Sequence, residues 1–256
     1  MDVPGISRPA LVVLMVVAGL LFLFGATKAV GLITQHTDTH TRVIAAVPAM
    51  VVHTRTGDVR IVAADRTDVR LTTKERRSVW SGGAHVKVSG DAANLDLDDD
   101  CDGALFIDDT CHAKFVLEVP RATDVRVVTG TGDLRTENLD GSVDLKAGTG
   151  DLRVIGARGP LRLDTDTGDV HVESPSSDIV ARTSTGDIRV EASVPGTIRT
   201  QADTGDIHIS VPDLTYALDV QTDTGDDNID VRPDDASPRK VRAHTQTGDV
   251  HVEADG

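Results

Sequence analysis

One short phrase, Thr-Gly-Asp followed by alternating apolar residues, constrains the fold of this chain more than any other feature. After residue 123 it occurs seven times, and the steps between successive glycines are 18, 18, 18, 19, 20 and 23 residues. A repeat of this length is typical of a solenoid, in which each unit buries its apolar side by stacking on the next unit. The glycines of the phrase are Gly132, Gly150, Gly168, Gly186, Gly205, Gly225 and Gly248, and Gly57 stands in the same phrase earlier in the chain.

Apolar residues occupy fixed positions around each glycine, at seven and five residues before it and at two and four residues after it. This alternation indicates β-strands, because successive side chains of a strand point to opposite faces. The inward parity changes at the glycine, so the chain must turn there, and glycine adopts a positive φ without steric cost. We therefore predict an all-β fold, a β-solenoid or β-helix-like stack of short strands with corners at these eight glycines.

An apolar, uncharged segment of 17 residues runs from position 10 to 26 and continues to position 33 after Lys28. Its length suits a transmembrane helix, and a cleaved signal peptide is the alternative. The predicted organisation is a cytoplasmic N-terminus at 1–9, a transmembrane anchor at 10–33, a polar tether at 34–42, N-terminal coils and a cap at 43–122, and the repeat solenoid at 123–256. The expected location is the cell membrane, with a single pass and an extracytoplasmic C-terminal domain.

The region before the repeats predicts strands at 68–73, 84–89, 93–98 and 114–120. The only two cysteines, Cys101 and Cys111, lie ten residues apart in this region. We predict a disulfide that closes an acidic loop at 98–111, because such a pair suits an oxidising compartment. A pair of reduced, buried thiols is the alternative.

The same acidic loop has the spacing of a calcium-binding loop. Counted from Asp98, carboxylates stand at positions one, three, five and twelve, which are Asp98, Asp100, Asp102 and Asp109, and Gly103 stands at position six. Aspartate replaces the usual glutamate at position twelve, and a cysteine occupies position four. We therefore expect a solvated acidic loop closed by the disulfide and no cofactor, and a calcium site is the alternative.

Two further columns carry charge. An aspartate follows each repeat glycine, and we expect it to form structural hydrogen bonds at the corner, with calcium in the turns as the alternative. The outward position three residues after the glycine is mostly basic, and this row could bind anionic wall polymers. The row comprises Arg135, Arg153, His171, Arg189, His208 and His251. The nine histidines show no group with the spacing of a metal site.

The net charge of −15 argues against a nucleic-acid partner, because nucleic-acid binding requires a basic surface. The sequence shows no catalytic constellation, and the repeats contain a single aromatic residue, Tyr216, with which to hold a sugar. We therefore expect no enzymatic activity. The sequence ends soon after the last corner, so we expect the last coil to be open and available for end-to-end self-association.

The run FVLEVPRATDVRVVTGTGDLRTENLDGSVDLKAGTGDLRVIG, with the repeats after it, resembles a bacterial putative-adhesin family. This is a domain-of-unknown-function family of repeat β proteins that often follow one membrane helix. The resemblance extends from about residue 41 to the end of the chain. It implies an extracytoplasmic all-β solenoid with a role in adhesion, and it carries over no catalytic or ligand-binding residue.

Together these patterns predict a non-enzymatic, membrane-anchored, extracytoplasmic β-solenoid that acts as an adhesin-like protein or a cell-envelope scaffold. Its expected partners are the membrane, through the N-terminal helix, and an envelope polymer or protein. A calcium-dependent extracellular binding module is the first alternative. A carbohydrate-active β-helix enzyme is the second.

Overall fold

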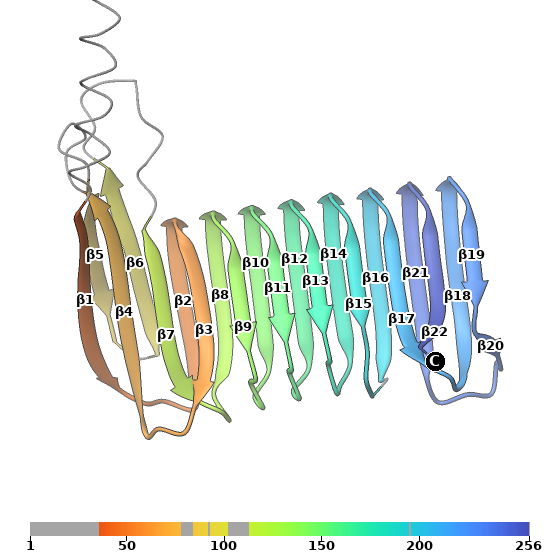
Figure 1. The fold of residues 1–256 in the computed structure, drawn as a ribbon, viewed down its shortest axis with the longest axis horizontal. Coiled ribbons are helices and arrows are strands. Elements are labelled where there is room, and N and C mark those ends of the chain that lie inside the picture. Colours follow the sequence, from red (N-terminus) through yellow and green to blue (C-terminus); the bar gives the residue numbers. More distant parts are fainter. Residues whose placement is uncertain (1–35, 78–83, 92, 102–112, 195, 256) are drawn as a thin grey trace, which may run out of the picture.

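The computed structural model describes residues 36–77, 84–91, 93–101, 113–194 and 196–255. The described residues form 22 β-strands and no helix, and the strands stack in two 11-stranded sheets (Figure 1). This confirms the predicted all-β stack. In spatial order, sheet A comprises β1 (His36–Ala45), β4 (Asp68–Arg77), β7 (Lys114–Pro120), β3 (Asp58–Ala64), β9 (Leu134–Glu137), β11 (Leu152–Ile155), β13 (Val170–Glu173), β15 (Ile188–Glu191), β17 (Ile207–Pro212), β22 (Val250–Asp255) and β19 (Asp227–Asp230).

Sheet B lies on the other side of the core. In the same direction along the stack it comprises β5 (Ala84–Gly90), β6 (Asn94–Cys101), β2 (Ala49–Thr56), β8 (Asp124–Thr131), β10 (Val143–Thr149), β12 (Leu161–Thr167), β14 (Ile179–Thr185), β16 (Thr197–Thr204), β21 (Lys240–Thr247), β18 (Thr215–Thr224) and β20 (Arg232–Pro233). We call one strand of sheet B, its corner glycine and the next strand of sheet A a rung. The rungs pair in parallel, so that residues at the same place in the repeat lie side by side, as Val143 and Leu161 do.

Each repeat glycine forms the corner between the two sheets. Its φ is +114° at Gly57 and between +138° and +144° at the other seven. These values lie in a region that residues with a side chain rarely adopt. The close approach of the rungs adds a second reason, because a Cβ at Gly168 would lie 2.1 Å from the carbonyl oxygen of Gly150.

The core is built from the apolar columns. Residues seven and five before the glycine, and two and four after it, are almost all buried in the central rungs, as Leu161, Leu163, Val170 and Val172 are. Buried threonines three residues before the glycine close the core at the corner. The Thr165 hydroxyl donates a hydrogen bond of 3.1 Å to the carbonyl oxygen of Gly150 in the preceding rung. The narrow core of the central rungs thus consists of aliphatic and small side chains, and the buried aromatic residues Phe115 and Tyr216 lie towards the two ends of the stack.

The rungs do not stack entirely in chain order. At the C-terminal end the rung β21–β22 lies between β16–β17 and β18–β19 (Figure 1). The last rung is therefore enclosed, and β18, β19 and β20 form the end of the stack. This corrects the expectation of an open last coil, because that coil pairs with a neighbour on both sides.

A similar exchange occurs at the N-terminal end. The rung β2–β3 lies against β8–β9 on one side and against β6 and β7 on the other. Strands β1, β4 and β5 then close this end with antiparallel pairing. The strands β4, β5, β6 and β7 confirm the four strands that the sequence predicted at 68–73, 84–89, 93–98 and 114–120. Residues 36–42, which the sequence analysis assigned to a tether, instead form part of β1.

No helix among the described residues has the length and apolar character needed to cross a membrane. The predicted cytoplasmic N-terminus at 1–9 and transmembrane anchor at 10–33 lie outside the described residues.

Candidate functional site

The corner aspartates link the rungs to one another. The carboxylate of Asp169 accepts a hydrogen bond of 2.8 Å from the backbone N–H of Asp187, and the N–H of Asp169 itself donates to Asp151 at 2.9 Å. The same bond recurs along the stack, so each carboxylate except that of Asp226, at the end of the ladder, accepts a hydrogen bond from a backbone donor of the neighbouring corner. In spatial order the ladder comprises Asp58, Asp133, Asp151, Asp169, Asp187, Asp206, Asp249 and Asp226. The structure thus gives these aspartates a structural role.

The predicted calcium and disulfide residues are only partly described. The backbone of residues 98–101 belongs to β6, where Asp98 pairs with Lys87 and Cys101 with Ala84 of β5. The side chains of Asp98 and Asp100 lie outside the described residues, as do Asp102, Asp109 and Cys111. The calcium site and the disulfide therefore stay predictions.

The basic row on the outer face of sheet A is paired with glutamates. Arg189 Nε donates to Glu191 Oε1 at 2.8 Å, and this hydrogen bond is the largest reason why the pKa of Glu191 lies below its usual value. The same arrangement recurs on the neighbouring strands β13 and β11, where His171 and Arg153 both contact Glu173. The row therefore carries little unbalanced positive charge with which to attract an anionic polymer.

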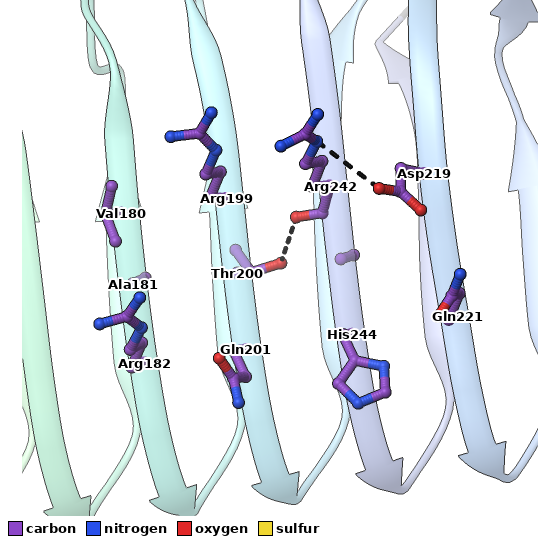
Figure 2. Close-up of a pocket in the computed structure, with 11 residues that line it drawn as sticks. Val180, Ala181, Arg182, Arg199, Thr200, Gln201, Asp219, Gln221, Arg242 and His244 are labelled. Carbon is purple, nitrogen blue, oxygen red and sulfur yellow. Dashed lines mark hydrogen bonds and ion pairs between the residues drawn. The ribbon is translucent and has the colours of Figure 1, made fainter.

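The outer face of sheet B contains a polar hollow of about 280 Å³ over β14, β16, β21 and β18 (Figure 2). We call it the sheet B hollow. Its polar side chains project outward from positions six and four residues before the corner glycines. They are Arg182, Arg199, Gln201, Arg242, His244 and Gln221, with Asp219 at the edge.

Positive charge in the sheet B hollow exceeds negative charge. Arg199 and Arg242 lie directly opposite each other on β16 and β21, and like charges in such a pair repel. Arg242 forms an ion pair with Asp219 at 3.5 Å. Among the described residues, no hydrogen bond or ion pair engages the side chain of Arg182 or Arg199. Elsewhere on the same face cations meet aspartates of the next rung, as Arg126 meets Asp144 at 3.5 Å.

His244 adds an unsatisfied polar atom to the sheet B hollow. Its Nδ1 is buried and has no hydrogen-bond partner in the described part of the chain. The register places Gln201 and Gln221 on either side of it, one on each neighbouring strand. Guanidinium forks, amides and an imidazole bind oxygen-rich groups, and guanidinium groups favour carboxylate and phosphate in particular. The geometry therefore suits an anionic group that lies across three or four rungs.

The sheet B hollow was not predicted from the sequence, because the predicted basic row uses only the outward positions after the glycine. The outward positions before the glycine hold basic residues at Arg182, Arg199 and Arg242, and this signal was available in the repeat alignment. The contact between Arg199 and Arg242 was not available, because it depends on the exchanged order of the last two rungs.

The sequence matches the family model described as Toastrack DUF4097 over residues 78–255. No protein among the curated sequences matches the chain. Similar solved structures include a putative cell adhesion protein from Clostridium sporogenes, with 8% identity and a TM-score of 0.39, over 86% of this chain and 100% of that chain. A putative adhesin from Bacteroides fragilis has 14% identity and a TM-score of 0.40, over 85% of this chain and 97% of that chain. Because the family match covers more than half of the sequence, the chain belongs to the Toastrack DUF4097 family.

Proposed function

We propose that this protein is a non-enzymatic, membrane-anchored, extracytoplasmic β-solenoid that binds an anionic polymer of the cell envelope. It would serve as an adhesin-like protein or an envelope scaffold. The observation that carries the proposal is the sheet B hollow, where Arg182 and Arg199 have no partner among the described residues although the whole chain carries a net charge of −15.

The charge of the whole chain makes this hollow unusual. An acidic surface repels polyanions, so an anionic ligand would bind only where local cations exceed local anions. A stable fold gains nothing from Arg199 beside Arg242, since the two guanidinium groups repel each other. An anionic ligand would remove this repulsion and would accept hydrogen bonds from both side chains.

The repeat geometry supports a polymer rather than a small metabolite. Side chains of the sheet B hollow recur at the strand spacing of about 4.8 Å across four strands, and the hollow is open along the face. A chain of carboxylate- or phosphate-bearing units could lie across these strands and contact several cations at once. The apolar segment at 10–33 supports an anchor that would hold the solenoid beside the envelope.

The test measures retention of the purified full-length chain on immobilised anionic wall polymer. Arg182→Ala/Arg199→Ala should bind at least tenfold more weakly, because a hydrogen bond to a charged group contributes about 1.5–3 kcal/mol. The matched control is Arg153→Ala/Arg189→Ala, which removes the same charge from the outer face of sheet A. The control should bind as tightly as the wild type does. Added salt should weaken the binding of the wild type and of the control.

Equal losses in the two double variants would show that only the net charge matters, and the sheet B hollow would then not be the binding site. Equal retention of the wild type and Arg182→Ala/Arg199→Ala would also rule out this site. Retention that requires calcium and persists in Arg182→Ala/Arg199→Ala would favour the calcium-dependent module instead.

A further inference from the structure

Two histidines and a glutamate meet on the outer face of sheet A, close to the end of the stack. His208 lies on β17, and His251 and Glu253 lie on β22, the next strand of the sheet. His208 and His251 are direct partners in the register. Their rings stack with centroids 5.0 Å apart and an angle of 12° between the planes.

Both imidazoles direct their Nε2 atoms at the same carboxylate. His208 Nε2 lies 3.0 Å from Glu253 Oε1, and His251 Nε2 lies 3.2 Å from Glu253 Oε2. The three candidate ligand atoms all lie within 4.8 Å of one another. Two atoms that each lie about 2.1 Å from one ion are at most about 4.2 Å apart, so small side-chain rotations would bring all three within reach.

The exchanged order of the rungs creates this cluster. In chain order, Asn228 would lie between His208 and His251 in this column, and the two histidines would be about 10 Å apart. The insertion of β22 between β17 and β19 places His251 beside His208 and moves Asn228 to the outer side. Spacing along the chain therefore could not predict this cluster, since the two histidines are 43 residues apart.

Ser210 supplies an independent sign that the cluster is incomplete. It lies opposite Glu253 in the register and on the same outward face as His208. Ser210 as a whole is only 4% exposed, and its Oγ is buried without a hydrogen-bond partner among the described residues. A buried hydroxyl without a partner costs free energy unless a ligand or its bound water completes the hydrogen bond.

The surrounding charges also favour a cation. Arg189, the neighbour of His208 on β15, is engaged with Glu191. On the other side, Asp230 of β19 lies opposite Glu253 in the register. Carboxylates thus lie on both sides of the cluster, and the nearest guanidinium is already neutralised.

We propose that His208, His251 and Glu253 bind a divalent transition metal of the zinc class and that this ion holds the rung β21–β22 in its position between β16–β17 and β18–β19. Two imidazoles and one carboxylate form a ligand set that suits zinc, with water in the fourth position. The ion would join β17 to β22 through side chains, in addition to the backbone hydrogen bonds between these strands. This site is separate from the sheet B hollow and does not depend on the proposed polymer.

The rung of His171 offers a matched comparison within the same row. His171 also contacts a glutamate two residues later, Glu173, at 3.0 Å. Its neighbours in the register are Arg153 and Arg189, so it has no second imidazole and it lies between two cations. We therefore expect no metal at His171.

The test titrates the full-length chain, first stripped with chelator, with zinc chloride and counts bound zinc by mass spectrometry. The wild type should bind one more zinc ion per chain than His208→Gln or His251→Gln, and His171→Gln should match the wild type. Zinc should also slow hydrogen exchange of β22 in the wild type and in His171→Gln, but not in His208→Gln or His251→Gln. The difference between variants isolates this site from other candidate ligands, such as the acidic segment at 98–109.

Equal zinc counts and affinities in the wild type, His208→Gln and His251→Gln would overturn the proposal. Equal loss in His171→Gln would also overturn it, because the effect would then follow from any histidine of the row. X-ray absorption of the wild type loaded with one equivalent of zinc keeps the test valid if a variant fails to fold. Two imidazole ligands would support the site, and fewer than two would contradict it.

Discussion

The central rungs and the C-terminal rungs are built from the same repeat but stack by different rules. From β8–β9 to β16–β17, each rung lies beside the rung that precedes it in the chain. The next two rungs exchange places, and the chain passes outward to β18–β19 before it returns to insert β21–β22. The repeat phrase therefore fixes which side chains face inward and where the corner lies, but it does not fix which rung is the neighbour.

The two regions also differ in burial. Leu161 in the central stack is 2% exposed. Leu218 occupies the same column in the rung β18–β19, which we call the end rung, and is only partly buried. Every residue of β19 is exposed, and Ile229 on that strand is 41% exposed. In the described structure this end rung has a neighbouring rung on one side only, and on the other side β18 pairs just with the two-residue strand β20. We expect it to open locally at a lower free energy than the central stack.

The two regions should differ most in the free energy of unfolding that is lost when a corner glycine is replaced by alanine. Gly168→Ala should lower the free energy of unfolding by about 4 kcal/mol, because strain at positive φ and the overlap with the preceding corner at Gly150 add together. Gly225→Ala meets nearly the same φ, +141° against +142° at Gly168, and the same 2.1 Å contact, here with the carbonyl oxygen of Gly248. Its cost should be below about 1 kcal/mol, since the end rung can separate and relieve the strain.

Urea denaturation measures the global effect, and hydrogen exchange shows where each variant opens. In Gly225→Ala the loss of protection should be confined to Thr215–Asp230. A global loss as large as that of Gly168→Ala would show that the end rung unfolds together with the centre.

The apolar column gives the next contrast. Leu161→Ala removes a buried side chain between two rungs and should cost about 3 kcal/mol. Leu218→Ala removes the same atoms from a partly buried place and should cost about 1 kcal/mol. Thermal and urea unfolding of both variants test the difference, and equal costs would mean that the end rung is as tightly packed as the centre.

The sequence predicted the repeat itself because its signals are local. Alternation of apolar residues placed the strands, and the Thr-Gly-Asp phrase placed the corners, as at Val170 and Gly168. The strands at 68–73 and 114–120 followed from the same alternation. These predictions need only the physics of one strand or one turn.

The order of the rungs could not be predicted, because it depends on contacts between segments with nearly identical corners. The N–H of Asp226 donates to Asp249, and the N–H of Asp249 donates to Asp206, although nothing near these residues distinguishes one rung from another. The one available signal was length. The steps after Gly205 grow to 20 and 23 residues. The passage across one rung falls in the first of these steps, where residues 213–214 join β17 to β18, and residues 234–239 then return the chain to the adjacent rung.

A smaller contrast concerns the aspartate ladder. Asp169→Ala leaves the N–H of Asp187 without its acceptor and should cost about 1 kcal/mol. Asp226 donates to Asp249 through its backbone, but its carboxylate accepts no corner N–H among the described residues. Asp226→Ala should therefore leave the free energy of unfolding nearly unchanged. Asp169→Asn keeps an acceptor and serves as the control, and a loss as large as that of Asp169→Ala would point to the charge instead of the hydrogen bond.

The smallest expected change in the free energy of unfolding concerns the rung β2–β3 at the N-terminal end, and this change depends on pH. Glu137 of β9 accepts hydrogen bonds from Arg60 of the neighbouring strand β3 at 2.9 Å and from Arg135 of its own strand at 2.5 Å. Burial raises the pKa of Glu137, but the two arginines outweigh burial and the pKa lies below its usual value. The ionised carboxylate thus helps to join the rung β2–β3 to the central stack.

A carboxyl group with a lowered pKa stabilises the fold above its unfolded pKa of about 4.3, and the contribution disappears as pH falls through the folded value. Glu137→Gln should cost about 0.5 kcal/mol at pH 7, because Arg60 is half exposed and solvent screens the pair. The difference from the wild type should vanish near pH 3 in urea titrations at both pH values. Glu191→Gln is the control, since Arg189 on the same strand is its hydrogen-bond donor and no bond between rungs is lost. A constant difference at both pH values would show that the ionised carboxylate of Glu137 does not join these rungs.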